Sequence, residues 1–226
     1  MKNYCLYKII LLMTIGVILP AQEWVRVNSP TSDDIINIKF HTKEYGFILT
    51  KNKLYRTTNA CKTWDTLRTK ANTDFRKFVS IDDKKMYVVS KFGELIKTTD
   101  GGNSWIDLGR IGRNWITEMF FVNEVVGYAA EINNSEGILI SPNDTVFLNK
   151  TVVGGHEWIR DRVDLPPIYA LYFINDSIGW AGGSLGFDPF TRLDFTENGG
   201  KNWTELNVRP VLDNEIRKII FTKNDV

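Results

Sequence analysis

The chain has 226 residues, of which 43% are hydrophobic and 24% charged, and its formal net charge at pH 7 is +1. A near-neutral chain lacks the basic surface expected of a nucleic-acid-binding protein. The two histidines, His41 and His156, lie far apart in the sequence and have no acidic or cysteine neighbour at ligand spacing. We therefore expect no metal site and no cofactor.

Residues 1–21 read as a secretory signal peptide. Two lysines, Lys2 and Lys8, precede an apolar run at 9–19, and Pro20-Ala21 follows the run. The run is too short to cross a bilayer as a helix, so we expect no stable membrane span after cleavage. The prediction is a bacterial protein that is secreted, periplasmic or at the cell surface, and an uncleaved anchor is the alternative. Of the two cysteines only Cys61 would remain, which excludes an intrachain disulfide in the mature chain.

Four octamers with one shared pattern divide the rest of the chain, and we call them boxes. Each has a Thr at its first position, a turn pair at the fourth and fifth, and a Trp at the eighth; they span 57–64, 98–105, 151–158 and 196–203. The tryptophans are 41, 53 and 45 residues apart. Such periods are typical of propeller blades or helical pairs, and the short β-rich segments between the boxes favour a propeller.

The chemistry of a box suits a hairpin turn. Asp100-Gly101 and Asn198-Gly199 are hairpin signals, because glycine reaches positive φ without steric cost. The Trp has enough apolar area to anchor the turn on the layer below. Ala60-Cys61 replaces the glycines of the first box and Val153 the Asp of the third, so we expect irregular turns there. The residues assigned this structural role are Thr57, Trp64, Thr98, Asp100, Gly102, Trp105, Thr151, Gly155, Trp158, Thr196, Asn198, Gly200 and Trp203.

Each repeat is predicted to hold four short strands bounded by turn residues, which is one blade of an all-β propeller. In the third blade we place the third strand at 137–141 and treat 142–150 as extra residues. Residues 23–28 resemble a fourth strand that closes the ring, and 215–226 resemble the start of a further blade. We expect an open arc of about four blades from a six- to eight-bladed ring, with blades at about 35–69, 74–109, 116–163 and 168–208.

The boxes resemble the Asp-box, or bacterial neuraminidase (BNR), repeat, whose form is roughly Ser/Thr-x-Asp-x-Gly-x-Thr-Trp. Within that class the chain looks most like the photosystem II assembly and stability factor type of propeller. The segments FVNEVVGYAAE at 121–131 and FINDSIGWAGG at 173–183 precede their boxes in the manner of that family. The resemblance implies a propeller that acts as a non-catalytic binding or assembly module, with a protein, a peptide or a glycan as its partner.

In a propeller, the loops that connect one blade to the next lie on the face opposite the box turns, together with those between second and third strands. We expect binding on this loop face, with 110–115 as its richest stretch. Two guanidiniums and an indole could grip a carboxylate and stack on a peptide or sugar ring. The alternative is that Trp115 fills the core between blades two and three while the arginines are solvated. The candidate binding residues are Arg110, Arg113, Trp115, Arg76, Phe92 and Phe187.

A secreted glycoside hydrolase, sialidase-like or endoglucanase-like, is the alternative function, with catalytic residues partly beyond Val226. Such enzymes use two facing carboxylates. Glu131, Glu136 and Asp188 are acidic residues in or near the loops, but no motif selects them over solvated acids. We therefore assign no catalytic residue and favour a non-catalytic binding protein.

Overall fold

The computed structural model describes residues 26–69, 74–133, 144–184, 191–207 and 216–220. Within them the chain forms four antiparallel sheets, and each sheet holds four strands in chain order. Blade one comprises β1 (Ile35–Phe40), β2 (Gly46–Thr50), β3 (Lys53–Thr57) and β4 (Asp65–Thr69), and blade two β5 (Phe75–Ser80), β6 (Met86–Ser90), β7 (Glu94–Thr98) and β8 (Ile106–Arg110). Blade three comprises β9 (Trp115–Phe121), β10 (Gly127–Asn133), β11 (Thr145–Thr151) and β12 (Ile159–Val163), and blade four β13 (Ile168–Phe173), β14 (Gly179–Ser184), β15 (Thr191–Thr196) and β16 (Thr204–Leu206).

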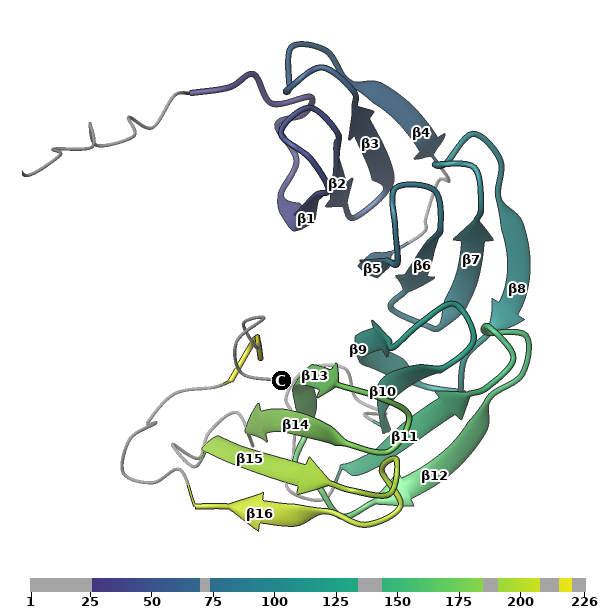
Figure 1. Cartoon of the computed structure of the whole chain (residues 1–226), viewed down its shortest axis with the longest axis vertical. Helices are drawn as coiled ribbons and strands as arrows, with labels where there is room; N and C mark the ends of the chain where they lie inside the picture. Colours follow the sequence, from purple (N-terminus) through teal and green to yellow (C-terminus); the bar gives the residue numbers. More distant parts are fainter. Residues whose placement is uncertain (1–25, 70–73, 134–143, 185–190, 208–215, 221–226) are drawn as a thin grey trace, which may run out of the picture.

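The four blades follow one another around an arc (Figure 1). The first strand of each blade lies on the inner side of the arc and the fourth strand on the outer side. This arrangement confirms the predicted all-β propeller of four-stranded blades. It also buries the second strands on both sides, so that every residue of β2 and β6 is buried.

Apolar clusters between neighbouring blades form the core. The cluster between blades one and two joins Phe47 and Leu54 of the first to Phe78 and Met86 of the second. A similar cluster follows at each of the next two junctions, and the Trp of a box packs against the junction with the preceding blade. These clusters contain Tyr87, Leu95, Ile111, Ile116 and Met119 with Trp158 against them, and Tyr128, Leu148, Ile168, Leu171 and Phe173 with Trp203 against them.

Hydrogen bonds inside the box fix its turn. In the second box the Thr98 hydroxyl donates to Asp100 Oδ1 at 2.7 Å and accepts from the Gly102 N–H at 3.0 Å. The Asp100 carboxylate also accepts the Ser104 N–H at 2.9 Å and its hydroxyl at 2.6 Å. Together these bonds lower the pKa of Asp100 to about 2, with the Ser104 hydroxyl as the largest cause. The Thr and Asp side chains of the box therefore stabilise the conformation of its turn.

The expectation of irregular turns in the first and third boxes is wrong. Both turns keep the bond from the fifth-position N–H to the Thr hydroxyl, at 3.0 Å in each. The backbone accordingly adopts the same left-handed conformation with or without glycine. The φ angles are 56° at Ala60 and 64° at Cys61, 66° at Gly154 and 90° at Gly155, against 72° at Gly101 and 89° at Gly102.

The placement of the third strand of blade three is also wrong. Residues 137–141 lie outside the described residues, and β11 (Thr145–Thr151) supplies this strand instead. In the other blades the third strand ends on the first residue of the box, as β7 does at Thr98. The apolar run at 137–141 stops ten residues short of the corresponding Thr151, so it cannot lead directly into the box.

The structure describes only part of the predicted closing strand at 23–28 and of the predicted further blade at 215–226. Residues 23–25 and 221–226 lie outside the described residues, and 26–28 and 216–220 have no strand assigned. The Trp64 indole N–H donates to the Asn28 carbonyl at 3.1 Å, which places the N-terminal segment against the first box. Residues 216–220 lie within the opening of the arc (Figure 1), where the Ile216 side chain covers Gly182 of β14.

The box turns lie at the same end of each blade as the turns between its first and second strands. The N–H of the fourth box residue donates to that neighbouring turn in every blade, for example from Gly101 to the Lys84 carbonyl at 2.9 Å. The loops between the second and third strands, and those between blades, therefore lie at the opposite end. This is the loop face.

Candidate functional site

Two stretches of the loop face meet at the junction of blades two and three. The turn between β6 and β7 contains Lys91 and Phe92, and residues 111–114 connect β8 to β9. Backbone hydrogen bonds of 2.9 Å join them, from the Ile111 N–H to the Gly93 carbonyl and from the Ile116 N–H to the Lys91 carbonyl. Residues far apart in the sequence thus form one surface.

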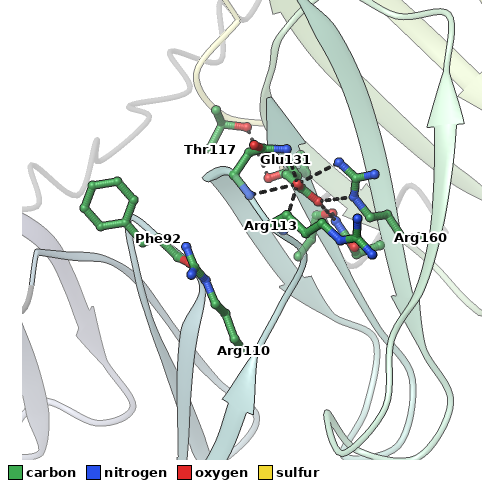
Figure 2. A network of polar contacts seen from close by, with 10 residues as sticks. Phe92, Arg110, Arg113, Thr117, Glu131 and Arg160 are labelled. Carbon is green, nitrogen blue, oxygen red and sulfur yellow. Dashed lines mark hydrogen bonds and ion pairs between the residues drawn. The ribbon is translucent and has the colours of Figure 1, made fainter. Parts of the chain in front are cut away.

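The side chains on this surface form a cation-aromatic cluster of Lys91, Phe92, Arg110 and Trp115. The Lys91 ammonium lies 3.5 Å from the centroid of the Trp115 ring and 5.7 Å from that of Phe92. The two rings meet edge to face at 6.5 Å. The Arg110 Nε–H donates to the Phe92 carbonyl, and the Phe92 side chain stays 44% exposed. Figure 2 shows Phe92 standing clear of the strands beside Arg110.

The structure separates the two interpretations of 110–115. Ile111 and Ile116 fill the core between blades two and three, at 0% and 1% exposure, whereas Trp115 is half-buried at the surface. Arg110 and Arg113 are both exposed. The core position that the alternative gave to Trp115 is therefore occupied by the isoleucines on either side of it.

Glu131 of β10 holds the loop at 111–114 in place (Figure 2). Its carboxylate is fully buried and accepts the backbone N–H groups of Arg113 and Asn114, both at 3.0 Å. The Asn114 amide donates at 2.7 Å and the Asn149 amide at 3.0 Å. Arg160 of β12 adds two further bonds, at 2.8 and 2.9 Å. Every lone pair that a carboxylate offers is thus engaged.

These contacts decide the charge of Glu131. Burial would raise its pKa, but the hydrogen bonds from Arg160, Asn149 and the Arg113 N–H outweigh burial and lower the pKa to about 2. A carboxylate with this pKa stays ionised at neutral pH and cannot act as a general acid. The sequence alone predicts Glu131 only as an acidic residue in or near a loop, although an acidic residue in an otherwise apolar second strand is a signal of a buried ionic network.

Arg76 lies apart from this cluster, on the inner side of the arc. It is the bulged residue of β5, because Phe75 pairs with Ser90 and Lys77 with Val89. A bulge re-aims a side chain, and Arg76 lines a cavity of about 430 Å³ at the loop-face end of the inner strands. Phe187 lies outside the described residues.

A second buried carboxylate belongs to β9. Glu118 is 6% exposed and pairs with Lys77 of β5 at 2.6 Å. Burial raises its pKa despite the nearby Lys77.

In the part of the chain that the structure describes, no three His, Cys, Asp or Glu side chains are placed to hold a metal ion. Nor do these residues include a helix of the length and apolarity needed to cross a membrane.

Comparison with known proteins agrees with this fold. Residues 18–113 match the family model described as photosynthesis system II assembly factor YCF48. YCF48 from Cyanidioschyzon merolae superposes with a TM-score of 0.59 and 14% identity, over 86% of this chain and 65% of that one. The chain is a YCF48-like Asp-box propeller. No curated protein matches its sequence.

Other propellers superpose on this YCF48-like chain as well. The GH74 enzyme of Niastella koreensis has a TM-score of 0.55 and 16% identity, over 72% of this chain and 27% of that one. An ancestral GH74 enzyme superposes with a TM-score of 0.58 and 18% identity, over 82% of this chain and 25% of that one. The chain thus spans about a quarter of the length of these enzymes and about two thirds of the YCF48 chain. At such identities the likeness concerns the fold alone.

Proposed function

We propose that the chain is an exported, non-catalytic assembly module that binds a protein or peptide through its loop face. The observation that carries the proposal is the exposed Phe92 ring, set beside Lys91 over Trp115 and next to Arg110, with the exposed Arg113 in the adjoining loop. Exposed aromatic and arginine side chains are the residues that most often dominate the energy of protein interfaces. The match to an assembly factor family over residues 18–113 supports the same class of function.

The surface is preorganised for such a ligand. Glu131 accepts a hydrogen bond from the backbone N–H of Arg113 and not from its side chain. The loop is therefore fixed while the Arg113 guanidinium stays available at the surface for a ligand. A rigid loop loses less conformational entropy on binding than a mobile one. We expect the arginines to contact a carboxylate of the ligand and Phe92 to contact an apolar side chain.

The test is an array of immobilised 12-residue peptides, probed with the fluorescently labelled full chain. We expect the chain to select peptides that contain acidic and aromatic residues. The variant Arg110→Ala with Arg113→Ala should bind these peptides at least about tenfold more weakly, with its melting temperature little changed. The matched control is Lys62→Ala with Lys201→Ala, two exposed cations in the box turns at the opposite end. Equal binding by both double variants would contradict the proposal.

Export is tested separately, by expression of the full chain in a bacterial host. We expect the protein in the periplasm or medium to begin near Gln22 by intact mass, because a basic leader, a short apolar run and Pro20-Ala21 precede that residue. Uncleaved protein in the membrane fraction would favour the anchor instead.

The glycoside hydrolase alternative rests on the fold likeness to the GH74 enzymes. It is tested by incubating the full chain with sialyl and β-glucan reporter substrates. Turnover that one carboxylate substitution abolishes would establish an enzyme and overturn the non-catalytic proposal.

A further inference from the structure

The four inner strands and residues 217–220 line a cavity on the inner side of the arc. Its volume is about 470 Å³, and Lys39, Lys77, Glu118, Tyr172 and Lys218 are among the residues that line it. The cavity that holds Arg76 continues it toward the loop face, because the two share Asn37, Lys77, Glu118 and Arg217. We call this combined space the channel. Each part has the volume of an ordinary small-molecule site.

β-bulges shape the mouth of the channel in all four blades. In each first strand the pairing with the second strand skips one residue near the start of the strand, which is the second residue in β1, β5 and β13 and the third in β9. All four skipped residues line the mouth. They are Ile36, Arg76, Thr117 and Tyr169. The mouth is therefore a repeated feature of the fold, into which each blade can place a different side chain.

The charges around the channel are strongly unequal. Its described lining contains five cationic side chains and one carboxylate, Glu118, which pairs with Lys77 at 2.6 Å. Three of the cations line the mouth, and the other two, Lys39 and Lys218, line the larger cavity that continues from it. A cleft with one excess sign of charge and low-dielectric walls raises the local concentration of counter-ions. The cations at the mouth are Arg76, Lys77 and Arg217.

The larger cavity also has apolar and aromatic residues in its lining. The rings of Phe120 and Tyr172, from β9 and β13, lie 5.4 Å apart and tilted, and both line the cavity. Val79 and Ile220 line the same part. The channel therefore has a cationic mouth and an aromatic interior, and these two features fit the two ends of one amphiphilic molecule.

We infer that the channel binds a small organic anion, with its acidic group among the cations of the mouth and its aromatic body against Phe120 and Tyr172. This site is independent of the proposed peptide-binding function, because it uses other residues and a different class of ligand. The acidic group would be a carboxylate, sulfonate or phosphate, all of which accept hydrogen bonds from guanidinium and ammonium groups.

The test is calorimetric titration of the full chain at low salt with three probes. 2-Naphthoate has both features, 2-naphthalenemethanol has the aromatic body without the charge, and inorganic phosphate has the charge without the body. We expect naphthoate to bind at least about tenfold more tightly than either of the others, and its affinity to fall as salt screens the cations. Equal affinity for the alcohol and the acid would overturn the inference.

The variant Arg76→Gln with Lys218→Gln removes two exposed cations of the channel, one from the mouth and one from the larger cavity, without touching the Lys77 to Glu118 pair. It should weaken naphthoate binding at least about tenfold, with an unchanged melting temperature. The double control Lys62→Gln with Lys201→Gln removes the same charge from the box turns and should bind as the wild type does. Binding that both double variants retain, or that the wild type lacks at millimolar naphthoate, would disprove the site.

Discussion

Glu131 and Arg160 form a bidentate ion pair that spans blade three from β10 to β12. The nitrogens Nε and Nη2 lie 2.8 and 2.9 Å from the two carboxylate oxygens. The Glu131 side chain is fully buried, the Arg160 side chain is 28% exposed, and the guanidinium lies 3.2 Å from the centroid of the Phe147 ring. A surface loop of the candidate site is thereby fixed by an anion inside the blade.

We predict that Glu131→Gln lowers the free energy of unfolding at pH 7 by about 3 kcal/mol, because it leaves the Arg160 charge without its partner. The value lies at the lower end for such pairs since Arg160 is partly exposed to water. Chemical denaturation measures the change, and Glu157→Gln on the exposed third box is the control. A loss below about 1 kcal/mol would show that the network is not stabilising.

The same pair predicts a pH dependence. The pKa of Glu131 is about 2 in the folded chain against a reference of 4.5. Because the folded-state pKa is depressed, the stabilisation is complete above pH 4.5 and is lost as the pH falls toward 2. The difference in unfolding free energy between wild type and Glu131→Gln should therefore shrink by about 3 kcal/mol over this window. Comparing the two proteins cancels the opposite dependence of Glu118 and Asp194, whose pKa values burial raises. A difference that is constant with pH would contradict the assignment.

We predict that Ala60→Gly stabilises the first box by about 1 kcal/mol, because Ala60 has a φ of 56° that costs a residue with a Cβ. The reverse substitution Gly101→Ala in the second box should destabilise it. There φ is 72° and the added Cβ would lie 2.9 Å from the Tyr45 hydroxyl. Melting curves of both variants check the pair of signs. If Ala60→Gly lowers the melting temperature, backbone strain in the first box is refuted.

Tyrosine hydroxyls connect successive blades at the end of the blades that carries the box turns. Tyr87 donates to the Glu124 carbonyl at 3.1 Å and Tyr128 to the Asp176 carbonyl at 2.7 Å. Each substitution by Phe should cost about 1 kcal/mol, and the double variant about the sum, since the two bonds lie at different junctions. Denaturation of the two single variants and the double variant tests this. A double variant no less stable than either single variant would show that the junctions do not act independently.

Much of the fold could be predicted because the same local sequence pattern, the box, occurs four times. Thr and Trp at fixed positions of a box specify a turn and an anchor through contacts within eight residues, as the hydrogen bonds around Thr98 and Asp100 show. The same logic failed where one box deviates. Ala60 and Cys61 were expected to disturb the turn, but the Thr57 hydroxyl keeps its bond to the Cys61 N–H and the backbone follows.

The third strand of blade three shows that an apolar run alone does not locate a strand. Gly137–Ser141 is more apolar than Thr145–Thr151, so hydrophobicity alone favours the segment that does not form the strand. The structure places the strand at 145–151, where Leu148 packs into the cluster between blades three and four and Thr151 enters the box directly. Distance to the box, and not apolar character, was the decisive signal.

By itself the sequence determined the repeat, the blade architecture and the stretch 110–115 on the loop face, because all three depend on residues close together in the chain. The tertiary structure decided which of these side chains meet. Lys91 covers Trp115, Glu131 holds Arg113 through its backbone, and the bulge at Arg76 points this residue to the channel. These contacts join residues from different strands and blades, and their geometry follows from strand register and blade packing, which no local pattern specifies.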